Sequence, residues 1–295
     1  MRIAVTGKNG QVATALKVLA RPGLEIKTLG RPELDLKEPQ SILGAIRATS
    51  PDAVISAAAF TAVDIAESNI DAAFAVNRDG ARAVAKAAAE LGVPIIHLST
   101  DYVFDGTKTT PYVEDDSTAP VSVYGRSKLE GELAVAAEAP NHVILRTSWV
   151  YSPYGNNFLK TMLKLADRQD VISVVSDQFG CPTSALDIAQ GIINIAKRLR
   201  TNNSPKLRGV FHIAGGGHTS WAGLAKLTFS VLEDQTGRHV SVREIPTSAY
   251  PTIARRPVNS RLDCSKLANS FGIRLPNWAE SAHQTVMSLV AGEKV

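Results

Sequence analysis

Short apolar runs and helix-like segments alternate along the first half of the chain. Strand-like apolar runs occur at residues 3–6, 26–29, 53–56, 94–99 and 143–147. Helix-like patterns lie between them at residues 11–20, 39–48 and 71–91, and in a helix containing residues 127–137. Nearly continuous apolar strands are typical of a sheet covered on both faces. The alternation therefore predicts a doubly wound parallel sheet with right-handed crossovers.

The alternation loosens after Tyr151. Helices are expected at residues 157–167, 186–199 and 221–232, and strands at 171–175, 210–214 and 240–245. A length of 295 residues exceeds one average domain and is below two large ones. We predict an α/β protein with a main domain over residues 1–150 and a smaller C-terminal α/β part over residues 151–295. Segments of the second part are expected to cross back to the first.

Composition and charge exclude several broad classes. Hydrophobic residues make up 44% of the chain and charged residues 20%, which excludes wholesale disorder. Lys and Arg number 32 against 28 Asp and Glu, without long runs of like charge, so no nucleic-acid partner is expected. The modest positive balance suits an anionic small substrate. No segment approaches the ~18 apolar residues of a membrane span, and the first apolar run is too short for a signal peptide. A soluble, cytoplasmic protein without a membrane partner is expected.

The residues that usually bind metals are sparse. Cys181 and Cys264 are the only cysteines, which is too few for a zinc cluster and weak evidence of secretion. The six histidines have no ligand spacing. No catalytic metal is expected.

A glycine-rich turn follows the first predicted strand and opens the first predicted helix. Gly7, Gly10 and Ala13 have the spacing Gly-x-x-Gly-x-x-Ala. Gly7 allows a tight turn, Gly10 lets the backbone approach a pyrophosphate, and Ala13 permits close packing of helix on sheet. Amides at the helix N-terminus would then face the phosphates. Such a turn can be purely structural, but its place in the first of several β/α units favours a Rossmann-type dinucleotide-binding domain.

The end of the second strand bears on the choice of cofactor. An acidic residue there binds the 2′-hydroxyl of the adenosine ribose, whereas Arg31 can accept a 2′-phosphate. NADPH is therefore favoured, with a solvated Arg31 and NADH as the alternative. The remaining cofactor candidates are Asp35 and Leu36 at the adenine edge, the small residues Ala57, Ala58 and Ala59 after the third strand, and Thr61 as a polar contact.

Tyr124 and Lys128 are four residues apart, so on a helix they share one face. An ammonium beside the phenol is expected to lower the pKa of Tyr124 from its ordinary value of about 10. The same lysine can hydrogen-bond a nicotinamide ribose. Thr100 ends the fourth strand, at the carboxyl edge where open α/β sheets bind ligands, and offers a hydroxyl to a substrate carbonyl. These three residues are the catalytic candidates.

The order of glycine turn, Thr100, Tyr124 and Lys128 resembles the extended short-chain dehydrogenase/reductase superfamily. Further stretches narrow this resemblance, namely residues 57–64, 99–106, 146–151, 155–158, 177–183 and 254–260. Together with residues 7–12 they are similar to the dTDP-4-dehydrorhamnose reductase family, from residue 3 to about Trp278.

The resemblance implies NAD(P)H-dependent reduction of the 4-keto group of dTDP-4-dehydro-6-deoxy-L-mannose. This is the last step to dTDP-L-rhamnose, a precursor of lipopolysaccharide or cell-wall polysaccharide. It implies cofactor contacts for Gly10, Gln11, Val12, Asp35, Leu36, Ala57, Ala58, Ala59, Tyr124 and Lys128. It also implies sugar contacts for Thr100, Asp101 and Trp149, with Tyr124 as proton donor and Trp149 stacking on the deoxysugar.

Two adjacent arginines, Arg255 and Arg256, precede Pro257 in a loop-like stretch. The substrate diphosphate needs cationic donors, and arginine binds phosphate groups bidentately. A surface pair is the alternative interpretation. Arg256 is favoured as the substrate-binding residue.

The chain departs from the family at two positions. Ala15 and Leu186 stand where some members carry glutamates that bridge a dimer through magnesium. A magnesium-bridged homodimer is therefore not expected, while another homodimer or a monomer stays open.

The sequence leaves several other functions open. A related nucleotide-sugar 4-ketoreductase of different stereochemistry and an epimerase with retained NAD⁺ are two of them. A dehydratase carries Glu where this chain has Tyr102. A non-catalytic regulatory subunit of the methionine adenosyltransferase type does not require the intact set of Thr100, Tyr124 and Lys128.

Overall fold

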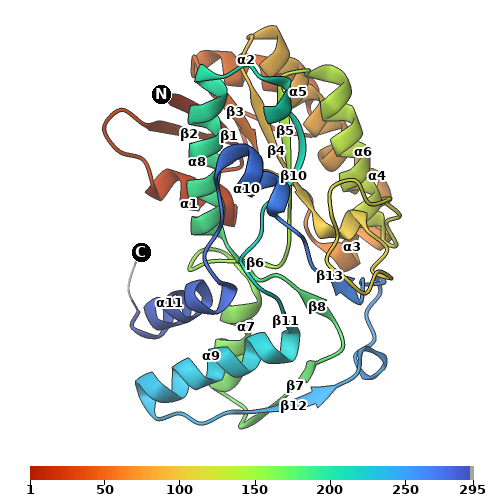
Figure 1. Ribbon diagram of the computed structural model, residues 1–295, viewed down its shortest axis with the longest axis vertical. Coiled ribbons are helices and arrows are strands. Elements are labelled where there is room, and N and C mark those ends of the chain that lie inside the picture. Colours follow the sequence, from red (N-terminus) through yellow and green to blue (C-terminus); the bar gives the residue numbers. More distant parts are fainter. Residues whose placement is uncertain (293–295) are drawn as a thin grey trace.

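A six-stranded parallel sheet forms the centre of the computed structural model, which describes residues 1–292 (Figure 1). Its strands lie in the order β10-β5-β4-β3-β1-β2. They are β1 (Arg2–Thr6), β2 (Glu25–Leu29), β3 (Ala53–Ser56), β4 (Ile95–Thr100), β5 (His142–Thr147) and β10 (Gly209–His212). The chain reverses direction across the sheet between β1 and β3, which is where open sheets of this kind bind ligands. The predicted doubly wound α/β fold is confirmed.

Helices cover both faces of this sheet (Figure 1). One face carries α1 (Gln11–Val18), α8 (Ala185–Thr201) and α10 (Ser265–Phe271), and the other carries α2 (Pro39–Ala48), α5 (Ala81–Glu90) and α6 (Val123–Glu138). Alternate strand residues supply the two cores because successive side chains point to opposite faces. In β1, Ile3 and Val5 pack with α1 and α8, while Ala4 packs with α2 and α5.

Segments from the second half of the chain complete the main sheet. Strand β10 pairs in parallel with β5, and α8 packs beside α1. The fully buried side chains of α8 include Ile188, Ile192 and Ile195. The division near residue 150 into two functional parts stays a prediction.

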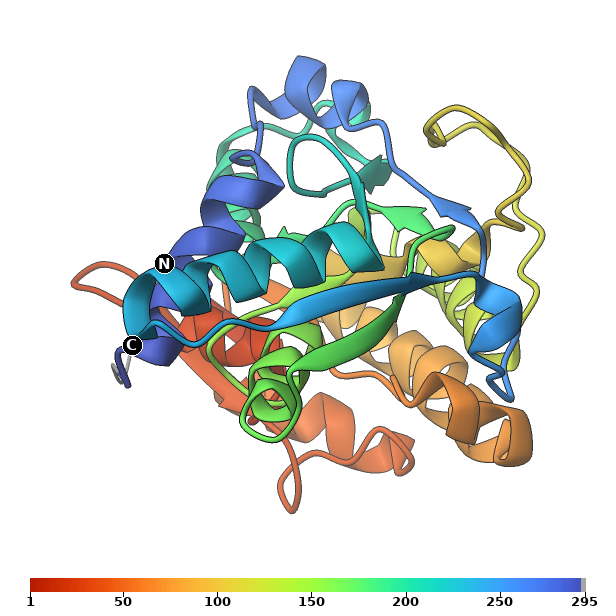
Figure 2. The ribbon, with the colours of Figure 1, turned by 90° about the horizontal axis from the view of Figure 1, so that it is seen from below.

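The rest of the second half forms a smaller layer of three helices and two strands. It contains α7 (Phe158–Ala166), α9 (Trp221–Thr236), α11 (Trp278–Val290), and the parallel pair β7 (Val171–Val175) and β12 (Ser241–Ile245). Figure 2 shows α9 and β12 running side by side across this end of the molecule. Met162, Ile172 and Phe229 are buried between these elements.

Very short strands connect the two layers. They are β6 (Val150–Tyr151) with β9 (Thr183–Ser184), and β8 (Phe179–Gly180) between β11 (Thr219–Ser220) and β13 (Asn259–Ser260). These two-residue strands were not predicted, because two residues carry no periodicity.

The alanine-rich segment at residues 71–91 is not one regular helix. It consists of α4 (Ile70–Phe74), a π-helical turn (Ala75–Gly80) and α5. Within the turn, the buried Asn77 side chain bonds the backbone amide and carbonyl of Phe60 and the hydroxyl of Ser127. The segment is helical as predicted, but its π-helical turn was not predicted, because this wider turn depends on contacts to distant segments.

Three helices were not predicted, α3 (Val63–Ser68), α10 and α11. The first two are only six and seven residues long. The N-cap of helix α11 is Asn277, whose side chain accepts a hydrogen bond from the amide of Ala279 at 2.9 Å. This helix-start signal is present in the sequence.

Within residues 1–292, no helix has the length and apolar character needed to cross a bilayer. The same residues contain no group of three or more His, Cys, Asp or Glu side chains placed to hold a metal ion.

Candidate active site

The turn after β1 has the geometry that its glycines indicate. Gly7 adopts φ = 99°, a conformation that side chains rarely take, and its amide donates to the Leu29 carbonyl at 2.6 Å. Gly10 is the N-cap of α1 and contributes no side-chain cap. A Cβ added at Gly10 would meet no atom within 4 Å, so open space lies beside the helix N-terminus. Free amides beside open space are suited to a phosphate.

Hydrogen bonds hold the backbone that follows strand β3 next to this turn. The hydroxyl of Thr6 accepts hydrogen bonds from the amides of Ala57 and Ala58, both at 3.1 Å. A Cβ on Gly7 would lie 3.4 Å from that of Ala58. The small side chains therefore allow two strand ends to approach each other closely.

A long cleft follows these strand ends and consists of two adjoining cavities of about 620 and 510 Å³. The residues lining both are Gly7, Lys8, Asn9, Ala58 and Ala59. The cavities therefore meet at the glycine turn, with one extending towards β2 and the other towards α6.

The first cavity contains the predicted adenosine residues Arg31, Asp35 and Leu36. Arg31 is exposed at the cavity edge, so its guanidinium is free to meet an anion there. Lys8, which sequence reasoning missed, lines both cavities and pairs with Glu33.

The second cavity brings together the predicted catalytic and nicotinamide-side residues. The predicted residues that line it are Gly7, Gly10, Gln11, Val12, Ala57, Ala58, Ala59, Thr61, Tyr124 and Lys128. The carboxyl ends of β4 and β5 contribute Ser99 and Thr147 to the same cavity. The side-chain oxygen of Thr147 is buried without a hydrogen-bond partner among the described residues.

Gln11 ties the glycine turn to the second half of the chain. Its amide nitrogen donates to the Val150 carbonyl at 3.2 Å, and its oxygen accepts from Ser152 at 2.7 Å and Asn157 at 3.0 Å. Gln11 thus lies in the cavity wall and also fixes the loop after β6.

Helix α6 positions Tyr124 and Lys128 through its first turn. Ser122 caps the helix by accepting from the Gly125 amide at 3.1 Å, and Glu67 accepts from the Val123 amide at 2.8 Å. A Cβ at Gly125 would lie 2.2 Å from the Tyr102 carbonyl oxygen, so only glycine permits this approach. The close packing of this turn holds the Tyr124 ring at one position in the cavity wall.

The pKa of Tyr124 moves opposite to the sequence-based expectation. Burial raises it to about 12, and the neighbouring Thr100 hydroxyl only partly opposes this effect. The expected lowering by Lys128 was wrong, because the cost of burying a phenolate dominates and the charge of Asp101 raises the pKa further. A phenol that stays protonated at neutral pH is suited to donate a proton.

Lys128 is buried, with 3% of its surface exposed. Burial lowers its pKa to about 8, while the charge of Glu132 on the next turn acts in the opposite direction. Its ammonium donates to the Leu98 carbonyl at 2.6 Å. The side chain is therefore fixed against the end of β4.

Thr100 and Asp101 lie just behind the cavity wall. The Thr100 hydroxyl donates to Asp101 at 2.9 Å, and the Ser148 hydroxyl donates to the same carboxyl group at 3.3 Å. Burial raises the pKa of Asp101 to about 6, and these hydrogen bonds oppose the shift. Thr100 does not line either cavity, unlike Tyr124 and Lys128, but its hydroxyl is close enough to Tyr124 to lower the pKa of that phenol.

Trp149 has an unusual backbone conformation with φ = 48°. Its indole stacks on that of Trp221, with ring centroids 3.5 Å apart and planes inclined by 6°. Gly180 also lies against it, since a Cβ there would be 2.4 Å from the indole. One face of the ring is therefore covered by Trp221, and sugar stacking on Trp149 stays a prediction.

Arg256 lies apart from both cavities. Its guanidinium pairs with Asp64 at 2.9 Å, and Asp64 also accepts from the Ala254 amide at 3.0 Å. Arg255 is exposed. The ion pair joins the loop before β13 to the start of α3.

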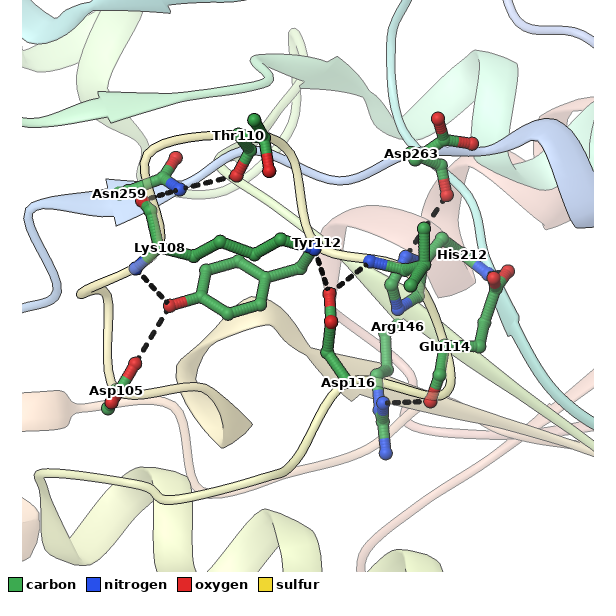
Figure 3. A network of polar contacts seen from close by, with 11 residues as sticks. Asp105, Lys108, Thr110, Tyr112, Glu114, Asp116, Arg146, His212, Asn259 and Asp263 are labelled. Carbon is green, nitrogen blue, oxygen red and sulfur yellow. Dashed lines mark hydrogen bonds and ion pairs between the residues drawn. The ribbon is translucent and has the colours of Figure 1, made fainter.

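A polar network holds the adjacent loop, residues 105–116 (Figure 3). Tyr112 donates to Asp105 at 2.8 Å, and the amide nitrogen of Asn259 donates to the Thr110 carbonyl at 2.9 Å. At the other end of the loop, Glu114 accepts from the His212 amide at 2.7 Å. The Asn259 bond connects this loop to the segment that follows Arg256.

The site fits a dinucleotide on three observations. Uncapped amides at α1 face open space, small residues line the middle of the cleft, and the Thr147 hydroxyl has no hydrogen-bond partner within residues 1–292. The positions of Ala15 and Leu186 do not favour a metal, since both side chains are apolar and pack in the core around α1 and α8.

Comparison with known proteins adds independent information. The family model described as the RmlD substrate binding domain matches residues 1–290. The dTDP-4-dehydrorhamnose reductase of Sinorhizobium fredii is 60% identical over 290 residues, which covers 98% of each chain. That of Burkholderia thailandensis is 43% identical and covers 99% of this chain and 100% of its own.

A solved structure shares the whole fold. The dTDP-4-dehydrorhamnose reductase of Bacillus anthracis, in complex with NADP, superposes with a TM-score of 0.89. It is 33% identical, and the match covers 97% of this chain and 99% of the other.

Proposed function

Because the chain belongs to the RmlD substrate-binding family, that of the dTDP-4-dehydrorhamnose reductases, we propose that it reduces dTDP-4-dehydro-6-deoxy-L-mannose to dTDP-L-rhamnose. The enzyme is an oxidoreductase of dTDP-rhamnose biosynthesis that uses NADPH, with NADH as the second cofactor. The Rossmann-type sheet supports the dinucleotide, and the exposed Arg31 at the edge of the adenosine cavity favours the 2′-phosphate.

One observation carries this proposal. Tyr124 and Lys128 line the same cavity as the glycine turn, and Thr100 lies next to Tyr124. A proton donor, a cation and a hydroxyl therefore meet where a nicotinamide would lie if its pyrophosphate occupied the turn.

The bound cofactor supplies the hydride that adds to C4 of the sugar. Tyr124 then donates its phenolic proton to the oxygen that develops negative charge, as a general acid. The high pKa of Tyr124 suits this direction, because the phenol is protonated before the reaction. Thr100 hydrogen-bonds the same oxygen, and Lys128 places its charge beside Tyr124 and the ribose.

The substrate side is assigned as part of the same proposal. The C-terminal part binds the dTDP-sugar, with Asp101 and Trp149 next to the sugar and Arg256 serving the diphosphate. To bind the phosphate, the Arg256 guanidinium would have to give up its ion pair with Asp64 or contact both anions at once. A cytoplasmic location belongs to this proposal, because reduced nicotinamides and nucleotide sugars are metabolites of that compartment.

The alternatives make different chemical demands. Dehydration requires a base at position 102, whereas burial raises the pKa of Tyr102 and keeps it protonated. An epimerase requires cofactor that remains oxidised and bound. A regulatory subunit requires no proton donor at all.

The test is an assay of the purified protein with the dTDP-keto-deoxysugar and either NADPH or NADH. We expect one nicotinamide oxidised for each sugar reduced, and a product with the L-rhamno configuration by NMR. A different configuration at C4 supports the related 4-ketoreductase. No oxidation of either nicotinamide would overturn the proposal.

A further inference from the structure

His97 is a buried histidine that the mechanism above does not use. It lies on β4, three residues before Thr100, and only 1% of its surface is exposed. Its ring has two side-chain partners. Nδ1 lies 3.0 Å from the Ser56 hydroxyl on β3, and Nε2 lies 3.4 Å from the Lys128 ammonium on α6.

The contact to Lys128 determines the tautomer of the ring, and the contact to Ser56 orients it. An ammonium can only donate, so Nε2 of His97 must accept from Lys128. In a neutral imidazole the other nitrogen then carries the proton, and Nδ1 donates to Ser56. Burial and the charge of Lys128 both lower the pKa of His97 well below its usual range, which keeps the ring neutral.

The contacts also orient the ammonium of Lys128. One of its three N–H groups donates to the Leu98 carbonyl at 2.6 Å, and a second is directed to His97. Both partners belong to β4. The third N–H is left for the cavity that Tyr124 and Lys128 line.

The other charged groups near Lys128 do not replace this acceptor. Glu132 follows one turn later on α6, but its carboxylate pairs with Arg146 of β5 at 2.7 Å and accepts from the Ser99 hydroxyl at 2.5 Å. Much of its charge is thereby compensated. His97 stabilises the ammonium as a neutral acceptor, without adding a second charge to the site.

We propose that His97, oriented by its hydrogen bond to Ser56, is a positioning residue that keeps Lys128 protonated and directed at the cavity. This inference rests on the proposed function for its consequence in catalysis, but not for its geometry. Removing the acceptor destabilises the ammonium, so Lys128 loses its proton at lower pH.

Two substitutions of His97 form a matched pair. In His97→Gln the amide group takes the place of Nε2, so an acceptor for Lys128 is retained. In His97→Asn it takes the place of Nδ1, so the contact to Ser56 is retained and the contact to Lys128 is lost. Ser56→Ala is a smaller change that removes the partner of Nδ1 and so leaves the orientation of the ring less constrained.

The first readout is an NMR titration of protein labelled with ¹³C-lysine, in which the Lys128 signal is the one absent from Lys128→Met. We expect its midpoint to fall by about one pH unit in His97→Asn, by less in Ser56→Ala, and hardly at all in His97→Gln. An unchanged midpoint in both His97→Asn and Ser56→Ala would overturn the proposal. If His97→Asn does not fold, Ser56→Ala decides.

The second readout is the pH profile of kcat/KM for keto-sugar reduction. Activity that needs the ammonium is present below the pKa of Lys128 and lost above it, so the alkaline limb should move to lower pH in the same order of variants. Equal profiles for His97→Asn and His97→Gln would contradict the positioning role. An inactive wild-type protein would overturn the proposed function, whereas the NMR titration would still test His97.

Discussion

The two ends of the cleft are built in different ways. At the phosphate end, Gly7, Gly10 and Ala58 act through backbone geometry and small size, and they belong to the first three strands and their turns. At the end beside Tyr124, which we propose for the substrate and call the substrate end, side chains from separate segments make the contacts. His97 and Lys128 are 31 residues apart, and Asp101 and Ser148 are 47 apart.

The two ends also differ in energetic cost. The phosphate end presents backbone amides and small apolar side chains, which need little compensation. The substrate end buries Asp101, Lys128 and His97, whose pKa values all move towards the neutral form. Buried ionisable groups with shifted pKa values destabilise the fold, but they are common at functional sites, where the chemistry requires them.

The largest expected effect separates chemistry from cofactor binding. Tyr124→Phe removes the only proposed proton donor and should lower kcat by about 10²- to 10⁴-fold. The dissociation constant for NADPH should remain within about twofold, because the phosphate end is unchanged. Steady-state kinetics and fluorescence titration with NADPH measure the two quantities. Near-normal turnover would remove Tyr124 from the mechanism.

The buried carboxyl group of Asp101 gives a prediction for stability. Its folded pKa of about 6 exceeds the ordinary value of 3.8, so the folded state holds the proton more tightly. Stability should therefore fall as pH rises from about 4 to 6, by up to about 3 kcal/mol from this group. The stability of Asp101→Asn relative to wild type should rise across the same interval in urea unfolding.

Asp105→Asn is the matched control for that experiment. Hydrogen bonds from Thr107 and Tyr112 lower the pKa of Asp105, so this carboxylate stabilises the folded state above its ordinary pKa. Its replacement should cost stability at pH 7 and less at low pH. If both variants show the same pH dependence, burial of Asp101 is not the cause.

The phosphate end could be predicted from the sequence because the patterns that define it are local. A glycine needed for φ > 0 and a helix N-terminus can be identified within a dozen residues, and the Tyr124–Lys128 pair follows from helical spacing. The predicted strands of the main sheet agree with the structure for the same reason.

The contacts at the substrate end could not be predicted from the sequence in the same way. The stacking of Trp149 on Trp221, the Asn77 contacts in the π-helical turn and the His97–Lys128 contact join segments that no local pattern connects. The sign of the Tyr124 shift was also wrong, because burial is a property of the folded chain. Only the family resemblance indicated Asp101 and Trp149.

Arg31 tests whether the phosphate end uses any side chain for specificity. If it binds the 2′-phosphate, Arg31→Ala should lower the ratio of kcat/KM for NADPH to that for NADH by about 10- to 100-fold, the value of one or two charge-assisted hydrogen bonds. Arg47→Ala, an exposed arginine on α2 outside the cavity, should leave this ratio unchanged. If the ratio is unchanged in both variants, Arg31 does not bind the 2′-phosphate and its side chain lies in solvent.

The smallest expected effect concerns the long-range ion pair. Arg256→Gln should raise KM for the dTDP-sugar about tenfold, or about 1.4 kcal/mol, with kcat and NADPH affinity nearly unchanged. Arg255→Gln removes the same charge from an exposed neighbour and should change KM less than twofold.

Asp64→Asn distinguishes two roles of Arg256. A partly exposed pair such as this one contributes about 1 kcal/mol, so a direct phosphate contact predicts little change in KM when only Asp64 is altered. If Asp64→Asn instead reproduces the effect of Arg256→Gln, the arginine serves to hold the loop, and even this side chain acts on the substrate through long-range structure.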